Sequence, residues 1–368
     1  MHIFYLTLPL LALGLDYLFK DPRGLPHPVQ AIGLLAAKLE AWARRFAQAD
    51  EDSDFRRVCI PGVAEVNAGY VAGALALCGV LLATGLTVFL LTHLPWLGWL
   101  FALYLAYAGL ALGSLLQAGQ RALAALQAVE RAQDATWPGD EFEQALARAR
   151  EAVGGLVSRD LSQAQGRELY RALAESLSEN FNDALVAPFF WLLLGGPSGP
   201  LGPLALWLYK AVSTMDSLWG YLTPQWRYLG FASARLDDIL AYVPARLSAI
   251  LLWLASFIAP CSGQWPGLAL IKQDAAKMAS PNAGWPMSAA AWLHAAHMGG
   301  PTVYFGETLQ KPILGPQQAS EGEVTADVLP VLAWNEAKIA DLLLHLRLAG
   351  LLGCALMWLV WAGLWFLF

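Results

Sequence analysis

Charged residues are scarce in this chain of 368 residues: they make up 14% of it, whereas 57% of the residues are hydrophobic. Soluble domains carry about 25% charged residues, and a soluble chain of this length would need charged surfaces on roughly two or three domains. The 23 basic and 29 acidic residues cannot cover such surfaces. The composition therefore excludes an ordinary soluble enzyme, a disordered protein and a disulfide scaffold. It predicts an all-α fold, namely a polytopic bundle of membrane helices.

The chain also lacks an excess of positive charge, paired cysteines and a glycine-rich phosphate loop. Its net charge of −6 argues against nucleic-acid binding. No GxxxxGK[ST] motif is present, nor a GxGxxG after a strand, so a nucleotide would have to bind by another arrangement. The four cysteines (Cys59, Cys78, Cys261 and Cys354) have no redox or metal-ligand spacing, and three of them lie in or beside apolar runs, where a thiol behaves as a small hydrophobic group. His294 and His297 lack a nearby acid at ligand spacing, so packed histidines are expected there.

Long apolar runs predict four membrane spans, because a hydrocarbon core about 30 Å thick needs about 20 residues. These spans are residues 1–19, 69–91, 94–116 and 348–368. Two further apolar segments are interrupted: residues 184–209 by a Gly- and Pro-rich stretch, and residues 239–260 by Pro244 and Arg246. Such segments are tolerated at membrane depth where protein shields them or water reaches them. We expect one or both to be broken or re-entrant, which leaves four to six crossings.

Basic residues predict the orientation of the chain in the cell (inner) membrane. The loops after the first and third spans are rich in Lys and Arg, whereas the link between the second and third spans has none. The N-terminus is therefore expected outside and both long loops in the cytosol. Residues 117–183 of the second loop form a predicted cytosolic helical insertion, with helix breaks at Trp137-Pro138-Gly139 and at Gly154-Gly155. Its third helix is predicted to run from about Ser162 towards Ala187.

The densest group of polar side chains lies in this third helix. Glu175, Glu179 and Asp183 follow one another at four-residue spacing and so share one helical face, with Asn180 beside them. Like charges at this spacing repel each other. Mg²⁺ carried by a phosphate substrate is the natural counter-charge, because it prefers a few carboxylates plus phosphate oxygens. A solvated acidic face is the alternative, but the apolar run that follows places these acids at the membrane boundary.

Further polar side chains lie before and between the two interrupted segments. Ser158, Arg159 and Asp160 follow a Gly-Gly helix stop, where they form either a helix N-cap or an anion-binding turn. Beyond them acidic and basic residues alternate, and an Arg inside an apolar run is a functional candidate whose planar guanidinium suits phosphate or carboxylate. The candidates in this region are Asp216, Arg227, Arg235, Asp237, Asp238 and Arg246.

Two polar loops are predicted in the C-terminal third of the chain. Residues 280–286 form a turn stiffened by proline, and a second loop follows the Gly-Gly-Pro sequence at residues 299–301. Long loops between apolar elements tend to be functional. These two contribute the candidates Asn282, Trp285, Tyr304 and Glu307.

A set of short motifs runs through the chain in a fixed order from about residue 10 to residue 310. They are Leu15-Asp16, Asp21-Pro22-Arg23, Pro26-His27-Pro28, Ser158-Arg159-Asp160, Glu175-Ser176, Glu179-Asn180, Thr214-Met215-Asp216-Ser217, Arg235-Leu236-Asp237-Asp238, Pro244-Ala245-Arg246, Ser280–Pro286 and Tyr304-Phe305-Gly306-Glu307. In this order they resemble the adenosylcobinamide-phosphate synthase family of cobalamin biosynthesis.

The resemblance implies a multi-pass membrane enzyme. Members join adenosylcobyric acid, a corrinoid, to an aminopropanol, usually its phosphate ester, through an ATP-dependent amide bond. The implied reactants are therefore the corrinoid, aminopropanol phosphate and ATP, with Mg²⁺ as cofactor, because activation of a carboxylate by ATP needs positive charge around the transferring phosphoryl group. The lipid bilayer is the implied environment. A second copy of the chain, or other membrane enzymes of cobalamin assembly, are the protein partners to consider.

Within this reaction the candidate residues take the following hypothetical roles. Glu179 and Asp183 hold Mg²⁺. Phosphate groups are neutralised by Arg159, Arg227 and Arg235, and the proton of the amine passes to Glu175, Asp237 or Asp238. Two other functions are alternatives. A membrane prenyltransferase would require two matched Asp-rich motifs, and a transporter or sensor would show inverted repeats.

Overall fold

The computed structural model describes residues 2–367 except 22–23, 25–26, 52–67, 135–138, 198, 222, 224, 262, 264, 305 and 317–332. The predicted positions Arg23, Pro26, Cys59 and the Trp137-Pro138 helix break lie outside the described residues. Helices make up most of the described chain, together with one pair of strands. The chain divides into two compact units. One comprises Met1–Leu110, Pro188–Ala241 and Trp361–Phe368, and the other comprises Ala111–Ala187 and Tyr242–Val360.

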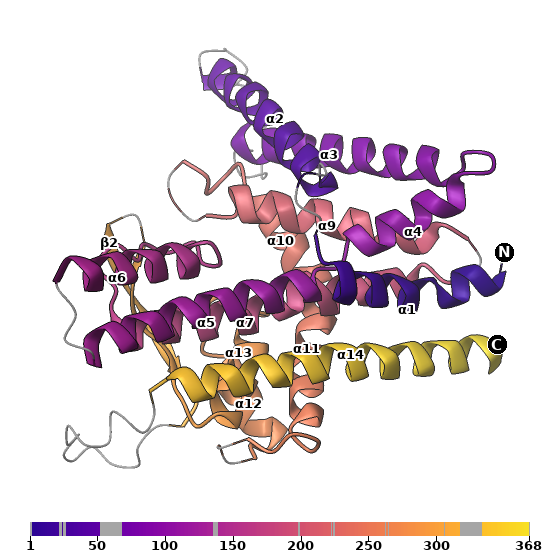
Figure 1. The fold of residues 1–368 in the computed structure, drawn as a ribbon. Coiled ribbons are helices and arrows are strands. Elements are labelled where there is room, and N and C mark those ends of the chain that lie inside the picture. The colour runs from indigo at the N-terminus through magenta and orange to yellow at the C-terminus, as the bar shows by residue number, and fades with distance from the viewer. Residues whose placement is uncertain are drawn as a thin grey trace. The chain divides into compact units, whose positions relative to one another are not determined.

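The first unit is built around the long apolar helix α3. Figure 1 shows α2 beside α3, and α9 packs against α2, α3 and α4. Trp207 on α9 is almost fully buried, and its indole N–H donates to the carbonyl of Leu105 on α4 at 2.8 Å. The helices of this unit are α1 (His2–Phe19), α2 (Pro28–Glu51), α3 (Ala68–Thr92), α4 (Gly98–Ala108), α8 (Ala187–Leu194), α9 (Leu201–Trp219) and α10 (Phe231–Leu240).

The second unit packs its helices closely through glycines. A methyl group on Gly350 would lie 2.7 Å from the Leu112 side chain and 2.9 Å from that of Leu185, so these leucines would have to shift to admit any larger residue. Figure 1 shows α5 and α6 side by side, and α7 packs on both. The elements are α5 (Leu112–Asp134), α6 (Gly139–Gly154), α7 (Gly166–Phe181), the π-helix η2 (Asn182–Val186), α11 (Tyr242–Ala255), α12 (Leu268–Ala275), α13 (Gly284–Leu293), β1 (Met298–Tyr304), β2 (Glu307–Leu314) and most of α14 (Glu336–Leu367).

By length and composition, three described helical segments could cross a membrane: Ala68–Thr92, Gly98–Gln133 and Glu336–Leu367. The consecutive helices α10 and α11 would add a fourth if they count as one bent span. This confirms the predicted class, a membrane helical bundle with a broken helix. The segment that begins at Gly98 runs further than the predicted span 94–116, into residues predicted to be cytosolic. The first predicted span, residues 1–19, corresponds to a shorter apolar helix over Ile3–Phe19.

The break predicted within residues 184–209 is present, because α8 ends at Leu194 and α9 begins only at Leu201. The helix predicted from about Ser162 is shorter than expected. It begins at Gly166, after a turn in which the backbone N–H of Ser162 donates to the Asp160 carboxylate at 2.8 Å. It then passes into the π-helix η2, so Asp183 lies on a widened turn rather than on regular α-helix.

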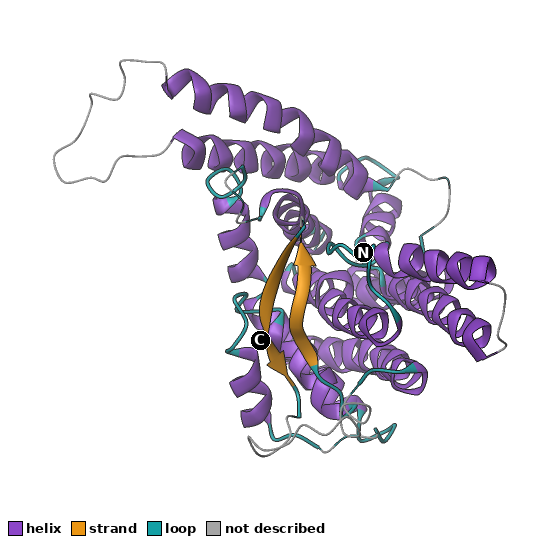
Figure 2. Cartoon of the chain, turned by 90° about the vertical axis from the view of Figure 1, so that its left-hand side faces the viewer, coloured by secondary structure: helices purple, strands orange, loops and turns teal. Residues whose placement is uncertain are grey.

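The second predicted loop is wrong, because Met298–Tyr304 and Glu307–Leu314 pair as antiparallel strands (Figure 2). Tyr304 pairs with Glu307, and Gly300 pairs with Lys311. Gly299 and Gly300 have φ angles of +88° and +81°, which favour glycine. The register is irregular between Met298 and Gly300, and the N–H of Gly299 donates to Glu175 on α7, so these glycines belong to a strand that contacts α7.

Candidate active site on α7

The acidic face predicted on this segment of the chain divides into two parts. Glu175 is buried, with 3% of its surface exposed, whereas Glu179, one turn further along α7, is exposed. Asp183 is half-buried in η2. The three carboxylates therefore do not share one environment, and the structure gives Glu175 a different set of partners from the other two.

Glu175 ties the β-hairpin to α7. One of its oxygens pairs with the Arg159 guanidinium, and the other accepts the backbone N–H of Gly299 at 2.7 Å. Arg171 lies 3.9 Å from the same carboxylate and donates to the carbonyls of Gly299 and Pro301, the latter at 2.8 Å. We name Arg159, Arg171, Glu175 and Gly299 the anchor network. Each of its three charged side chains makes at least one hydrogen bond, which offsets part of the cost of burying the charge.

Glu179 and Asp183 interact unfavourably with each other. Burial and, after it, the neighbouring charge of Asp183 raise the pKa of Glu179 to about 7, although Lys311 and Arg159 act in the opposite direction. Part of the Glu179 residue nevertheless remains accessible to solvent, although the surrounding protein is dense enough to raise its pKa. Asp183 accepts a hydrogen bond from the Asn182 amide at 2.8 Å. The pair is thus an accessible site of concentrated negative charge.

Further hydrogen bonds fix this part of the chain. The hydroxyl of Ser248 on α11 donates to Asn182 at 3.1 Å, so α11 supports η2. The predicted residue Asn180 donates to the Ser176 hydroxyl at 2.8 Å, and Ser176 in turn donates to the carbonyl of Leu156. Asn180 therefore joins α7 to the loop that carries Ser158, Arg159 and Asp160.

The hairpin carries a cation, Lys311, whose charge lowers the pKa of Glu179. The ammonium of Lys311 on β2 donates to the Tyr304 hydroxyl at 2.7 Å and lies 4.9 Å from the centre of that ring. Tyr304 was predicted as a binding residue, but Lys311 was not. In the sequence Lys311 is one Lys in a polar stretch, and only strand pairing shows that it lies on the same hairpin as Tyr304. Glu307, the partner of Tyr304 in the register, is exposed.

A second group of predicted residues surrounds Arg246 on α11. The guanidinium lies over the rings of Tyr242 and Trp285, at 3.3 Å and 4.8 Å from their centres. It donates to the Asn282 side-chain oxygen at 3.2 Å. Three predicted candidates, Arg246, Asn282 and Trp285, are therefore in mutual contact within the second unit. Stacking holds the guanidinium in place while leaving it partly exposed.

The remaining candidates belong to the first unit. Arg235 and Asp238 on α10 form an ion pair at 3.7 Å, and the Arg235 side chain is 67% exposed, which makes the pair weak. Asp237 is half-buried on the same helix, and Arg227 is exposed in the preceding turn. Asp216 lies near the end of α9, where its carbonyl accepts the Gly220 N–H at 2.6 Å.

Two other side chains in the second unit carry structural roles. Asp274 on α12 is buried, and its carboxylate accepts hydrogen bonds from the Trp292 indole and the Gly315 N–H, both at 2.8 Å. His294 is fully buried, with ring centres 5.0 Å from His345 and 5.6 Å from Trp334. Burial, together with the charge of His345, lowers the pKa of His294 to about 3. It is a packed histidine, as expected from the sequence.

The acidic pair has the chemistry of a Mg²⁺ site but not a full ligand set. In the part of the chain that the structure describes, no group of three or more His, Cys, Asp or Glu side chains is arranged to hold a metal ion. Mg²⁺ often binds through only one or two carboxylates plus water and substrate phosphates. The mutual repulsion of Glu179 and Asp183 would be relieved by such a cation, so the residues fit the ion as a complex with phosphate.

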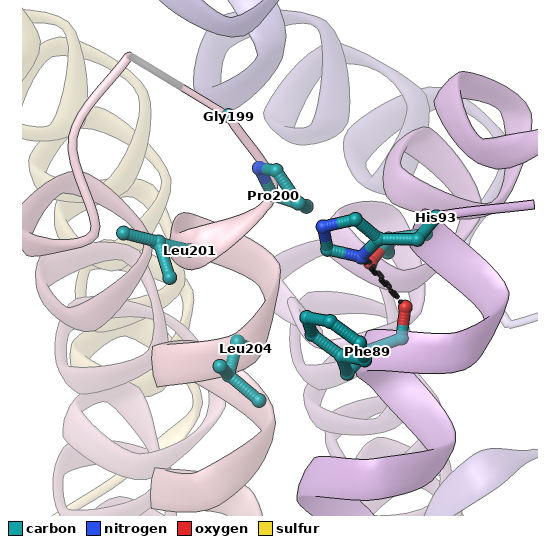
Figure 3. A pocket seen from close by; sticks show the side chains of 7 residues that line it. Phe89, His93, Gly199, Pro200, Leu201 and Leu204 are labelled. Carbon is teal, nitrogen blue, oxygen red and sulfur yellow. Dashed lines mark hydrogen bonds between the residues drawn. The ribbon is translucent and has the colours of Figure 1, made fainter.

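The cavity shown in Figure 3 lies in the first unit and has a different character. It has a volume of about 170 Å³ and is lined by Phe89, Thr92, His93, Gly199, Pro200, Leu201 and Leu204. The His93 ring is held by the carbonyl of Phe89, 2.8 Å from its Nδ1 atom. The lining is mainly apolar and carries no acidic or basic side chain apart from the imidazole, so it does not suit phosphate chemistry.

Comparison with known proteins identifies the family. A model of the CobD/CbiB protein family matches residues 9–331. The chain belongs to the CobD/CbiB family. It is 33% identical to the cobalamin biosynthesis protein CbiB of Salmonella typhi over 347 residues, which are 93% of this chain and 97% of that protein. It is 36% identical to the cobalamin biosynthesis protein CobD of Klebsiella pneumoniae over 307 residues, 82% of this chain and 84% of the other. No solved structure matches it.

Membership of the CobD/CbiB family gives the protein a role in cobalamin biosynthesis, with a corrinoid substrate and a membrane context. This confirms the resemblance inferred from the motifs. The acidic, amide and guanidinium groups described above are thus the candidate active-site residues of a membrane protein in this pathway.

Proposed function

We propose that this CobD/CbiB protein is an ATP-dependent acid–amine ligase. It joins adenosylcobyric acid to aminopropanol phosphate, or to aminopropanol, to give adenosylcobinamide phosphate or adenosylcobinamide. The observation that carries the proposal is the accessible carboxylate pair Glu179 and Asp183, with the cations Arg159 and Lys311 acting on it from the same unit. A metal–phosphate complex requires carboxylates that hold the metal and cations that neutralise the phosphate oxygens.

The chemistry divides into two displacement steps. A carboxylate oxygen of the acid attacks the γ-phosphorus of ATP, and ADP leaves with the electrons of the broken P–O bond. The amine nitrogen then attacks the acyl carbon, phosphate leaves, and the nitrogen gives up a proton to a base. An amine does not displace the oxygen of a free carboxylate at a useful rate, so ATP supplies the activation.

The side chains of the second unit bind and orient the reactants in this proposal. Glu179 and Asp183 would hold Mg²⁺, which when bound supplies positive charge for the phosphate oxygens. Arg246, stacked between Tyr242 and Trp285 and partly exposed, would bind a carboxylate or phosphate with its remaining donors.

Glu175 takes a positioning role in this proposal. Both of its oxygens are engaged by the anchor network, so it holds the β-hairpin against α7 rather than accepting a proton. Asp237 and Asp238 stay predicted proton acceptors, and Arg227, Arg235 and Asp216 stay predicted contacts of the substrate. All five lie in the first unit.

We place the enzyme in the cell (inner) membrane with its active site facing the cytosol. The three apolar helical segments support a membrane location, and the basic loops support the orientation. Both ATP and the precursors of a cytosolic pathway would reach the site from that face. Family membership gives the prenyltransferase and transporter alternatives no support.

The proposal is tested with purified protein in membranes, adenosylcobyric acid, aminopropanol phosphate and MgATP, with the coupled product detected by mass. We expect product that depends on each of ATP, Mg²⁺ and the amine, with one ADP formed per amide bond. Product formed without ATP, or ATP use without coupling, would contradict the ligase assignment. A parallel reaction with free aminopropanol shows which amine is preferred.

A further inference from the structure

Arg246 carries a positive charge in an apolar helix without an acidic side chain beside it. It is the one charged residue of α11, and it is partly exposed. Among the described residues, no Asp or Glu side chain forms an ion pair with this guanidinium. A charge in an apolar segment is usually paired with an opposite charge or marks a functional site. The lack of an acidic partner therefore indicates that Arg246 binds an anionic ligand.

Three hydrogen bonds fix the Arg246 guanidinium and leave one of its edges open. Nη1 donates to the backbone carbonyl of Tyr242 at 2.6 Å and to the Asn282 side-chain oxygen at 3.2 Å. Nη2 donates to the carbonyl of Pro281 at 3.4 Å. An arginine side chain has five N–H donors, so in the described part of the chain the Nε–H and one N–H of Nη2 have no acceptor. These two nitrogens form one edge of the planar group, which a carboxylate fits with two parallel hydrogen bonds.

The surrounding residues hold this edge in place. The rings of Tyr242 and Trp285 lie against the guanidinium, which is 3.3 Å and 4.8 Å from their centres. Asn282 is buried, and its backbone N–H donates to the Ser280 hydroxyl at 3.3 Å. The guanidinium is thus oriented before any ligand arrives, which lowers the entropy that binding costs.

The charge and the walls of the site favour an apolar molecule that carries one carboxylate. A single guanidinium balances the single charge of a carboxylate, whereas the transferring phosphates of ATP need several cations or metal ions. The Tyr242 residue is 51% exposed, so its ring also offers apolar surface to a bound molecule. Among the reactants of the proposed ligase reaction, only the corrinoid acid carries a carboxylate. The other two carry phosphate.

We infer that Arg246 binds the carboxylate of the corrinoid acid through its Nε and Nη2 donors, with Trp285 as a positioning residue. The identity of the acid rests on the proposed function. The assignment of a carboxylate site rests on the contacts of Arg246 alone. Trp285 acts through the guanidinium, because its ring limits the directions in which the open edge can point.

The direct test is equilibrium binding of two ligands to the full-length protein in detergent, at neutral pH, where the acid is ionised. One ligand is adenosylcobyric acid. The other is the same molecule with its carboxylate replaced by a carboxamide, which keeps the size and removes the charge. The parent protein should bind the acid about 10- to 100-fold more tightly than the amide, the range for hydrogen bonds to a charged group. Arg246→Gln should bind both ligands with similar Kd values.

Matched variants separate the charge, the planar fork and the ring. Arg246→Lys keeps the charge but lacks the fork, so its preference for the acid should lie between those of the parent protein and Arg246→Gln. Trp285→Leu should lower this preference, and Trp285→Phe, which keeps a ring, should retain most of it. Arg148→Gln removes an exposed guanidinium on α6 and should keep the parental preference. The thermal midpoint of each variant distinguishes lost binding from lost folding.

The outcomes separate the inference from the ligase assignment. If the parent protein forms product but Arg246→Gln and Arg246→Lys keep its preference for the acid, the inference is wrong and the ligase assignment stands. If the parent protein prefers the acid through Arg246 but forms no product, the carboxylate site stands and the ligase assignment fails. The inference is also overturned if Arg246→Gln weakens the binding of MgATP and not that of the acid, because the site then takes phosphate.

Discussion

The anchor network makes a sharp prediction for Glu175→Gln. This substitution keeps the shape of the side chain and one oxygen to accept the Gly299 N–H, but it removes the charge that Arg159 and Arg171 require. The Arg159 and Glu175 side chains are 6% and 4% exposed, so water cannot replace the lost partner. The variant therefore leaves buried positive charge without compensation.

The expected loss of stability follows from this burial. Removal of one partner from a buried ion pair costs about 3–5 kcal/mol. For a unit of this size, 1 kcal/mol shifts the thermal midpoint by about 2–4 °C, so the midpoint should fall by about 10 °C. The matched control is Glu168→Gln. Glu168 lies 4.0 Å from the same Arg171 but is 45% exposed, and such surface pairs contribute at most about 1 kcal/mol.

The assay is thermal unfolding of the two variants and the parent protein in the same detergent, with near-ultraviolet circular dichroism as the signal. The reasoning is refuted if Glu175→Gln is as stable as Glu168→Gln. If Glu175→Gln instead has the thermal midpoint of the parent protein but forms no product, Glu175 is a proton acceptor, as the sequence suggested.

Two further predictions concern stability. Gly299→Ala should lower the thermal midpoint much more than Gly306→Ala. Both glycines have positive φ angles, but an added Cβ at Gly299 would lie 2.0 Å from the Pro312 carbonyl oxygen, whereas an added Cβ at Gly306 would meet no atom within 4 Å. Equal midpoints would contradict the packing of the hairpin. His294 should make the fold acid-sensitive, because its pKa of about 3 in the folded protein lies below the ordinary value of 6.5. The stability that the neutral ring contributes is complete above pH 6.5. It is lost as the pH falls towards 3. Between pH 6.5 and 5.0 the free energy of unfolding, measured by urea titration, should fall by about 2 kcal/mol. His294→Asn should lack this dependence on pH. An unchanged dependence in the variant would show that other groups cause it.

Much of the fold could be predicted, because hydropathy alone marks the long apolar helices. Residues 69–91 correspond closely to α3, and the Gly- and Pro-rich break does separate α8 from α9. The hairpin could not be predicted. In the sequence, Gly299-Gly300-Pro301 is as typical of a loop as of a strand whose glycines have positive φ angles. The contact with Glu175 on α7, which favours the strand, is visible only in the structure.

The acidic residues of the candidate site could be predicted from the sequence, but their contacts with other elements could not. Four-residue spacing indicated Glu175, Glu179 and Asp183 as candidates. Spacing cannot show that Glu175 is buried by a hairpin far away in the sequence while Glu179 stays accessible. Arg171 and Lys311 were missed for the same reason. The carbonyl partners of Arg171 lie more than a hundred residues away, and Lys311 meets Tyr304 only through the pairing of the hairpin.

The most direct test of the account is the rate of product formation by Asp183→Asn. The measurement uses membranes that contain equal amounts of folded protein, with adenosylcobyric acid, aminopropanol phosphate and MgATP, and Glu151→Gln, an exposed carboxylate on α6, as the control. The account predicts that Asp183→Asn forms no detectable coupled product while Glu151→Gln matches the parent protein. A parental rate for Asp183→Asn would contradict a phosphate-activating site on α7 and η2.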